Sequence, residues 1–231
     1  MDATTSGSAV EIAGRVRAVI FDLDGVLIDS EPVWEQVRRG LVEEHGGRWP
    51  DDVQTHLLGM NTAEWARYLS EDLGVGLPPG EVADVVIVRM AGRYAESLPL
   101  MPGADHALRR LSARWRLALA SSSPRRLIDS VLAAAGWADL FEATVSTDEV
   151  GRGKPAPDVY LEAARRLGVP ASACAAVEDS SNGLRSAAAA DTPVIAIPRP
   201  QYAPAPDALK LAALVLTSLT DLTVAAVEQI R

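Results

Sequence analysis

Hydrophobic and polar positions alternate regularly through the C-terminal part of the chain. Apolar runs of four or five residues predict buried strands at residues 116–120, 143–146, 173–177, 193–197 and 213–216. Segments with helical apolar spacing separate them at residues 104–113, 124–135, 157–167 and 182–190, and a last helix is expected from Leu219. Strands that alternate with helices of about ten residues are typical of βαβ units. The pattern therefore predicts a parallel sheet covered by helices.

The N-terminal part follows a different pattern. An apolar run at residues 16–21 predicts one strand, but only helices are predicted between it and residue 98, at residues 32–44, 51–58, 62–73 and 79–97. The first strand has no neighbour in sequence to pair with, so the helical block is most simply an insertion between this strand and the rest. We expect an α/β fold with a Rossmann-like parallel-sheet core, residues 15–29 and 98–231, and an inserted all-helical domain, residues 30–97.

Composition narrows the class of protein. The 231 residues are 48% hydrophobic, which is enough for a core, and the net charge of −9 with no basic run argues against nucleic-acid and anionic-membrane partners. Residues 1–14 lack the pattern of a secretion signal, and no apolar run approaches the length of a membrane span. The single cysteine, Cys174, lies in an apolar run and is expected to be buried and inert. We expect a cytoplasmic protein that is a monomer or a weak dimer.

Two carboxylates follow the first strand directly. Asp22 and Asp24 are two residues apart, so in an extended chain their side chains share a face. Crowded acids stay ionised together only when a cation or strong donors compensate them, and oxygen ligands without nearby Cys or His favour Mg²⁺. Asp and Gly are also ordinary turn residues, so for Asp22-Leu23-Asp24-Gly25 alone a structural and a functional role are equally supported.

Polar residues also follow the later strands. Residues 121–123 are three serines before Pro124, which suits an anion at a helix N-terminus and equally a serine N-cap with proline at the first helical position. Lys154 stands in a loop stiffened by prolines, where it suits a phosphate or a carboxylate partner, although a surface lysine is the default. Glu178 and Asp179 form a second carboxylate pair, which also fits the first turn of a helix. Four such features at the carboxyl ends of parallel strands favour a functional site.

Together these motifs resemble the haloacid dehalogenase-like (HAD) superfamily. The four ordered motifs are Asp22-Leu23-Asp24-Gly25-Val26, Ser121, Gly153-Lys154-Pro155 and Glu178-Asp179-Ser180. Two further strings, at residues 28–32 and 154–158, are similar to its β-phosphoglucomutase and sugar-phosphatase branch, in which the helical insertion is a cap. The resemblance implies a Mg²⁺-dependent phosphatase that acts on a small phosphorylated metabolite, a sugar phosphate above all, through an aspartyl-phosphate.

The resemblance also implies roles for individual residues. Asp22 would be the nucleophile and Asp24 the general acid and then base, with Ser121 and Lys154 completing the catalytic set. Asp24 argues against dehalogenation, because a halide leaving group needs no proton. The implied metal ligands are Asp22, Asp24 through its backbone carbonyl, and Asp179, with Glu178 in support. The implied substrate contacts in the core are Gly25, Ser122 and Ser123.

Specificity in this branch comes largely from the cap. The stretch Gly59-Met60-Asn61-Thr62 resembles the cap loop that contacts substrate. A β-phosphoglucomutase has a basic residue just after the turn of this loop, and Thr62 occupies that place, so we favour a monophosphate phosphatase over a phosphomutase. Asn61 or Thr62 is alternatively an ordinary helix N-cap. A non-catalytic phosphate-binding protein is the third possibility, and the intact set of acids argues against it.

Overall fold

A single parallel sheet forms the centre of the molecule. The computed structural model describes residues 16–57 and 60–230. Within these ranges the sheet has six parallel strands in the order β3-β2-β1-β4-β5-β6. The strands are β1 Ala18–Phe21, β2 Arg116–Ser121, β3 Ala143–Ser146, β4 Cys174–Glu178, β5 Val194–Ala196 and β6 Leu214–Val215. The predicted α/β fold is confirmed, and the first strand pairs with strands far away in sequence.

Helices cover both faces of the sheet because alternate strand residues point to opposite faces. Val19 and Phe21 of β1 belong to the apolar cluster that includes α5 Ala104–Ser112, α6 Arg125–Ala135 and α10 Val224–Gln229. Ala18 and Ile20 belong to the opposite cluster, with α7 Asp158–Leu167, α8 Ser181–Ala189 and α9 Pro206–Leu209. The cluster on the second face is rich in alanine, whose small side chains allow helices to pack closely on a sheet.

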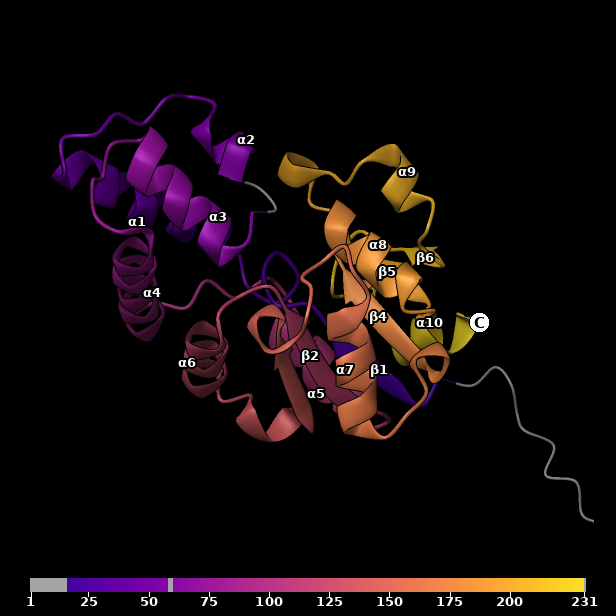
Figure 1. The fold of residues 1–231 in the computed structure, drawn as a ribbon. Coiled ribbons are helices and arrows are strands. Elements are labelled where there is room, and N and C mark those ends of the chain that lie inside the picture. Colours follow the sequence, from indigo (N-terminus) through magenta and orange to yellow (C-terminus); the bar gives the residue numbers. More distant parts are fainter. Residues whose placement is uncertain (1–15, 58–59, 231) are drawn as a thin grey trace, which may run out of the picture.

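Between β1 and α5 the described residues form helices joined by loops and turns, and no strand of the sheet. This segment contains α1 Glu31–Glu44, α2 Val53–Leu57, α3 Thr62–Arg67, a π-helical turn Tyr68–Asp72 and α4 Pro79–Glu96. These helices gather to one side of the sheet, with α4 packed on α6 (Figure 1). The chain enters and leaves the segment at one place, because Asp29 N donates to Pro99 O at 2.8 Å and Met101 N donates to Leu27 O at 2.9 Å. The division into a core and a cap at residues 30 and 97 stays a prediction.

The helix expected from Leu219 starts later than predicted. Helix α10 begins at Val224, and the Thr223 hydroxyl accepts a hydrogen bond from Ala226 N at 3.1 Å as its N-cap. Residues 217–221 form a turn instead, in which Asp221 accepts hydrogen bonds from Thr217 and Ser218. Local side-chain hydrogen bonds of this kind compete with helix formation. The short helix α9, Pro206–Leu209, was not predicted from the sequence.

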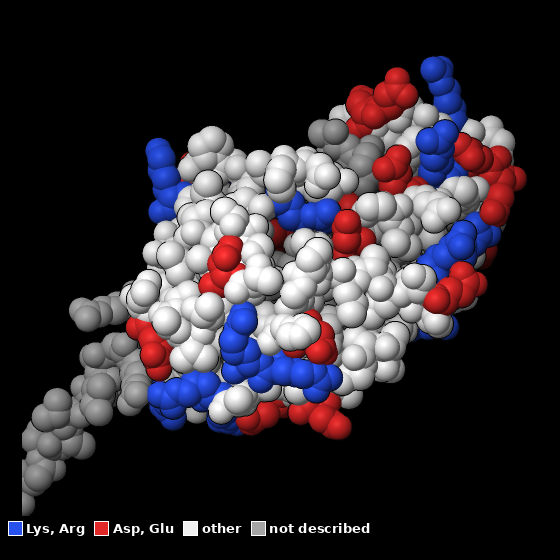
Figure 2. All heavy atoms as spheres, turned by 180° about the vertical axis from the view of Figure 1, so that it is seen from behind, with Lys and Arg blue, Asp and Glu red and all other residues white. Residues whose placement is uncertain are grey.

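The surface carries mixed charge. Figure 2 shows basic side chains beside acidic ones over much of one face. One example joins two helices of the insertion, where the guanidinium of Arg89 donates to both carboxylate oxygens of Glu44 at 2.8 and 2.6 Å. Such exposed pairs contribute little to stability individually. Among the helices of the described residues, none has the length and hydropathy that spanning a membrane requires.

Candidate active site

Three predicted site residues meet at the carboxyl edge of the central strands. Asp22 directly follows β1, and Glu178 ends the neighbouring β4. The ladder aligns these ends, because Phe21 lies opposite Val177 and the Asp22 N–H donates to Val177 O at 3.0 Å. Ser121 ends β2 on the other side of β1. Sheet register therefore brings together Asp22, Ser121 and Glu178, which are 57 to 156 positions apart in sequence.

Lys154 joins two of the acids. Its Nζ lies 2.7 Å from Asp22 Oδ1, 2.6 Å from Glu178 Oε1 and 3.0 Å from the carbonyl oxygen of Ala120. An ammonium group has three protons, so these three acceptors satisfy it fully. The Lys154 side chain is only 5% exposed. It is thus a structural counterion within the site rather than a surface charge.

Glu178 is held by a complete set of donors. Oε1 accepts from Lys154 Nζ and from the Tyr160 hydroxyl at 2.9 Å, and Oε2 accepts from Asp179 N, Ser180 N and Ser180 Oγ at 3.1 to 3.2 Å. A Cβ on Gly183 would lie 1.8 Å from the Glu178 carboxyl carbon, so only glycine fits there. These contacts orient Glu178 firmly, and Tyr160 is a supporting residue that the sequence analysis missed.

A compact carboxylate cluster has room for a cation. Asp22, Glu178 and Asp179 each offer a ligand atom, and these atoms lie within 4.8 Å of one another. Burial raises the pKa of Asp22 to about 8 against the opposing effect of Lys154, and burial with the nearby Glu178 and Asp22 carboxylates raises the pKa of Asp179 well above its ordinary value. Three acids with one ammonium leave an excess of negative charge, which a divalent cation would compensate.

The surroundings of Asp179 also suit a bound cation. Its Oδ1 is buried and has no hydrogen-bond partner among the described residues. A Cβ on Gly25 would lie only 2.0 Å from Asp179 Oδ2, so a side chain does not fit there. Gly25 also has a φ of +83°, which favours glycine. The glycine thus brings the backbone close to a carboxylate that has unused ligand capacity. Oxygen donors of this kind suit Mg²⁺.

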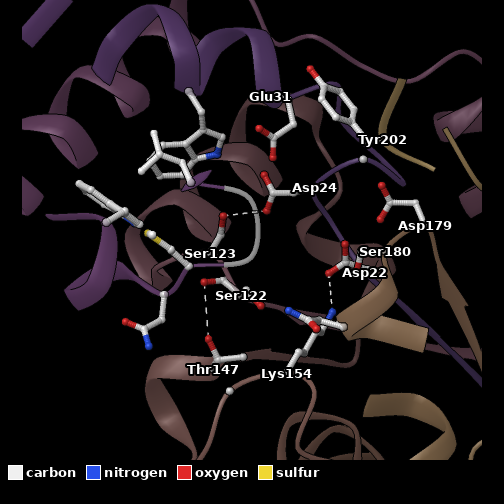
Figure 3. A pocket seen from close by; sticks show the side chains of 18 of the residues that line it. Asp22, Asp24, Glu31, Ser122, Ser123, Thr147, Lys154, Asp179, Ser180 and Tyr202 are labelled. Atoms are coloured by element: carbon white, nitrogen blue, oxygen red, sulfur yellow. Dashed lines mark hydrogen bonds and ion pairs between the residues drawn. The ribbon is translucent and has the colours of Figure 1, made fainter. Parts of the chain in front are cut away.

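The serine cluster does not act as a single unit. Ser123 Oγ donates to Asp24 Oδ2 at 2.7 Å, Ser121 Oγ donates to the same atom at 3.4 Å, and Ser123 N donates to Ser121 Oγ at 2.9 Å. Ser121 is fully buried, whereas Ser122 and Ser123 line the cavity (Figure 3). Ser121 and Ser123 therefore hold Asp24 in place in this structure, and Ser122 forms no hydrogen bond with it among the described residues.

One expectation about the serine cluster is wrong. A serine N-cap with Pro124 at the first helical position was predicted, but α6 begins at Arg125 and Pro124 itself is the N-cap, with no side-chain cap bond. The physical reason is that the Ser123 hydroxyl is directed to Asp24 instead of to the helix. The hydrogen bond to Asp24 thus takes the place of a side-chain cap on α6.

A cavity of about 950 Å³ connects this edge of the sheet to the inserted helices. Met60, Asn61 and Thr62 line it on the side of the inserted helices, and the predicted contact Gly59 lies outside the described residues. Asn61 is the N-cap of α3, since its Oδ1 accepts from Glu64 N at 3.0 Å and its own N–H donates to Glu64 Oε2 at 2.9 Å. The alternative of an ordinary helix cap is therefore correct for the Asn61 side chain.

Replacing Asn61 by alanine is expected to lower the free energy of unfolding by about 1 kcal/mol, because the reciprocal capping bonds with Glu64 are lost. Asn61→Asp keeps the acceptor and serves as the control. Urea denaturation followed by circular dichroism measures both variants. Equal stability of Asn61→Ala and the wild type would contradict a stabilising role for this cap.

Several residues that line the cavity were not predicted from the sequence. Glu31, Trp34 and Arg38 of α1 line it, as do Trp65 of α3 and Tyr202 beyond β5. The first three recur at i, i+3 and i+7, so one face of α1 carries two charges and a tryptophan. That spacing was a usable signal, because charged residues on a buried helix face require a partner. Tyr202 had no comparable signal.

The comparisons with known proteins agree with this geometry. Residues 16–191 match the family described as haloacid dehalogenase-like hydrolase. Hexitol phosphatase B of Escherichia coli (strain K12) is 34% identical over 216 residues, which cover 90% of this chain and 95% of that protein. Protein CbbY of Rhodobacter capsulatus is 36% identical over 198 residues, covering 80% and 86%. The crystal structure of CbbY from Rhodobacter sphaeroides in complex with phosphate has a TM-score of 0.82 at 26% identity, covering 92% and 99%. The chain belongs to the haloacid dehalogenase-like hydrolase family.

Proposed function

We propose that the protein is a Mg²⁺-dependent phosphatase of a small phosphorylated metabolite, in particular a sugar phosphate. The observation that carries the proposal is the placement of two differently held carboxylates in one cavity. Asp22 Oδ1 is 2.7 Å from Lys154 Nζ, and Asp24 Oδ2 is 2.7 Å from Ser123 Oγ. The relative named hexitol phosphatase B and the similar structure that binds phosphate support the same class of substrate.

The two acids have different roles in the proposed reaction. An Asp22 carboxylate oxygen attacks phosphorus, the bond from phosphorus to the leaving oxygen breaks, and Asp24 gives its proton to that oxygen. Asp24 then takes a proton from water, whose oxygen attacks the aspartyl-phosphate and releases inorganic phosphate and Asp22. Lys154 opposes the effect of burial on the pKa of Asp22 and so favours the ionised form, which a nucleophile requires. Ser123 holds Asp24 beside the cavity, where it can reach the leaving group.

Other residues of the site bind and neutralise charge. Asp22, Asp179 and the backbone carbonyl of Asp24 would hold Mg²⁺, which when bound neutralises the charge of the transferred phosphoryl group. Glu178, whose oxygens already accept five hydrogen bonds from described residues, orients Lys154 and the start of α8. Ser122 and the backbone at Gly25 would contact the phosphoryl oxygens. Ser121, buried beneath them, acts through Asp24 and Ser123.

The cap side favours a phosphatase over a phosphomutase. A phosphomutase must hold the second phosphate of a bisphosphate, and residues 60–62 of the cap loop carry no positive charge. We propose that residues 30–97 act as a cap, which closes over the cavity and excludes water until the substrate is bound. A non-catalytic binding protein would not need the arrangement of Asp22, Asp24 and Lys154.

Phosphate release from a panel of sugar phosphates, phosphoglycolate and nucleotides tests the proposal. We expect turnover of at least one sugar phosphate with Mg²⁺ and its loss in excess chelator, because the carboxylate cluster is left with uncompensated charge. Ca²⁺ is expected to inhibit, since its looser and higher coordination misplaces the attacking carboxylate. Full activity in chelator would contradict the metal dependence, and absence of release from every phosphomonoester would contradict the phosphatase.

A further inference from the structure

A buried guanidinium lies in the cap, at the wall of the cavity. The Arg38 Cζ is 4.3 Å from the ring centroid of Trp34 and 4.9 Å from that of Trp65, and the residue is 7% exposed. Its Nε is buried and has no hydrogen-bond partner among the described residues. Burial lowers the pKa of Arg38 to about 10, so the side chain remains charged near neutral pH. Arg38 is thus a cation that two tryptophans hold in one orientation.

Stability alone does not explain this arginine. Buried ionic groups can often be replaced by apolar residues of similar volume without loss of stability, or with a gain. The position next to Trp34 and Trp65 would suit a leucine or methionine. Arg38 instead lines the cavity that contains Asp22 and Asp24. A fixed cation that faces a substrate cavity indicates recognition of a ligand.

Glu31 supplies the opposite charge. It lies two turns before Arg38 on α1 and lines the same cavity. Burial raises the pKa of Glu31, and the nearby positive charge of Arg38 acts in the opposite direction. Figure 3 shows the Glu31 carboxyl group directed towards Asp24, on the cap side of the proposed catalytic acid. The leaving group of a phosphomonoester would lie there, because Asp24 must reach its oxygen.

The charges that line the cavity favour a neutral leaving group over one that carries a second anionic group. Among the described lining residues, the carboxylates are Asp22, Asp24, Glu31, Glu64 and Asp179, and the cations are Arg38 and Lys154. Lys154 is already bonded to Asp22 and Glu178. A second anionic group on the substrate would therefore have Arg38 alone, with Glu31 beside it. A neutral group with several hydroxyls fits better, because Arg38 donates and Glu31 accepts hydrogen bonds.

We propose that Arg38 and Glu31 determine specificity by binding the hydroxyl groups of a neutral, polyhydroxylated leaving group and by disfavouring a substrate with a second anionic group. The inference rests on the proposed phosphatase function. It assigns these two residues to specificity rather than to the chemical step. Removing either charge should consequently change the order of substrates.

The experiment measures kcat/KM of the full-length protein with Mg²⁺ for a set of neutral sugar and polyol monophosphates, phosphoglycolate, fructose 1,6-bisphosphate and p-nitrophenyl phosphate. Arg38→Gln is expected to lower kcat/KM for the neutral sugar phosphates by about tenfold, mainly through KM, since a charged hydrogen bond is lost. Glu31→Gln leaves Arg38 without its neighbouring negative charge. It should raise kcat/KM for phosphoglycolate relative to the best neutral substrate by about tenfold.

The exposed pair Arg39 and Glu43 on the same helix, 2.8 Å apart, provides matched controls in Arg39→Gln and Glu43→Gln. Melting curves of all variants show whether a substitution affects folding. Arg38→Lys tests recognition, because lysine keeps the positive charge and should keep the preference for neutral substrates better than glutamine does. The inference is overturned if the substrate ratios move no more than in the controls. It is also overturned if the wild type has a higher kcat/KM for phosphoglycolate or fructose 1,6-bisphosphate than for the neutral monophosphates. The same holds if Arg38→Gln lowers kcat/KM only for those two anionic substrates. Failure of the phosphatase itself would appear separately, as absence of release from p-nitrophenyl phosphate by the wild type.

Discussion

Asp22→Asn is expected to abolish phosphate release, by on the order of 10⁵-fold or more as for other lost nucleophiles, while the protein stays folded. The amide can still accept a hydrogen bond from Lys154, whose Nζ also keeps Glu178 and the Ala120 carbonyl. Burial raises the pKa of Asp22 to about 8, so its ionised form destabilises the folded state. Without metal the variant should therefore be no less stable than the wild type.

Steady-state phosphate release measures the loss, and mass spectrometry after acid quenching detects the aspartyl-phosphate. We expect a phosphorylated species in the wild type and none in Asp22→Asn. Asp129→Asn, at a largely exposed position on α6, is the control and should behave like the wild type. Substantial turnover by purified Asp22→Asn would rule out the covalent mechanism.

The carboxyl edge of the sheet was predictable because it depends on few physical rules. Strands of a parallel sheet end at one edge, so Asp22, Ser121 and Glu178 were expected at that edge once their strands were identified, and the strand order β2-β1-β4 makes them neighbours. The prolines around Lys154 correctly indicated a fixed position. The family resemblance gave the order of these motifs, and the comparisons confirm that family.

The cap side was less predictable because it depends on packing between helices distant in sequence. Arg38 contacts Trp34 one turn before it on α1, but only the tertiary contact of α1 with α3 brings Trp65 to it. The serine cluster was misinterpreted for a related reason. A capping preference is local, whereas the hydrogen bond from Ser123 to Asp24 joins residues 99 positions apart. Local propensity gives way where a tertiary contact competes with it.

Lys154→Met is expected to remove activity and to lower the free energy of unfolding by about 3 to 5 kcal/mol in chelator, because it leaves buried charges without their partner. Lys154 Nζ is 2.7 Å from Asp22 and 2.6 Å from Glu178, whose side chains are 9% and 0% exposed. The only other lysine of the chain, Lys210, is exposed, so Lys210→Met is a matched control with an expected effect within about 0.5 kcal/mol.

A double-mutant cycle with Glu178→Gln separates the lost charge pair from lost packing. If Lys154 stabilises the fold by compensating Glu178, the double variant should be more stable than the sum of the single losses predicts, by about 0.5 to 3 kcal/mol. Urea denaturation of the four proteins in chelator gives this difference. Additive losses would show that the two charges are not coupled. Equal midpoints for Lys154→Met and Lys210→Met would show that the carboxylate cluster needs no internal cation to fold, and Lys154 would then act only on bound phosphate.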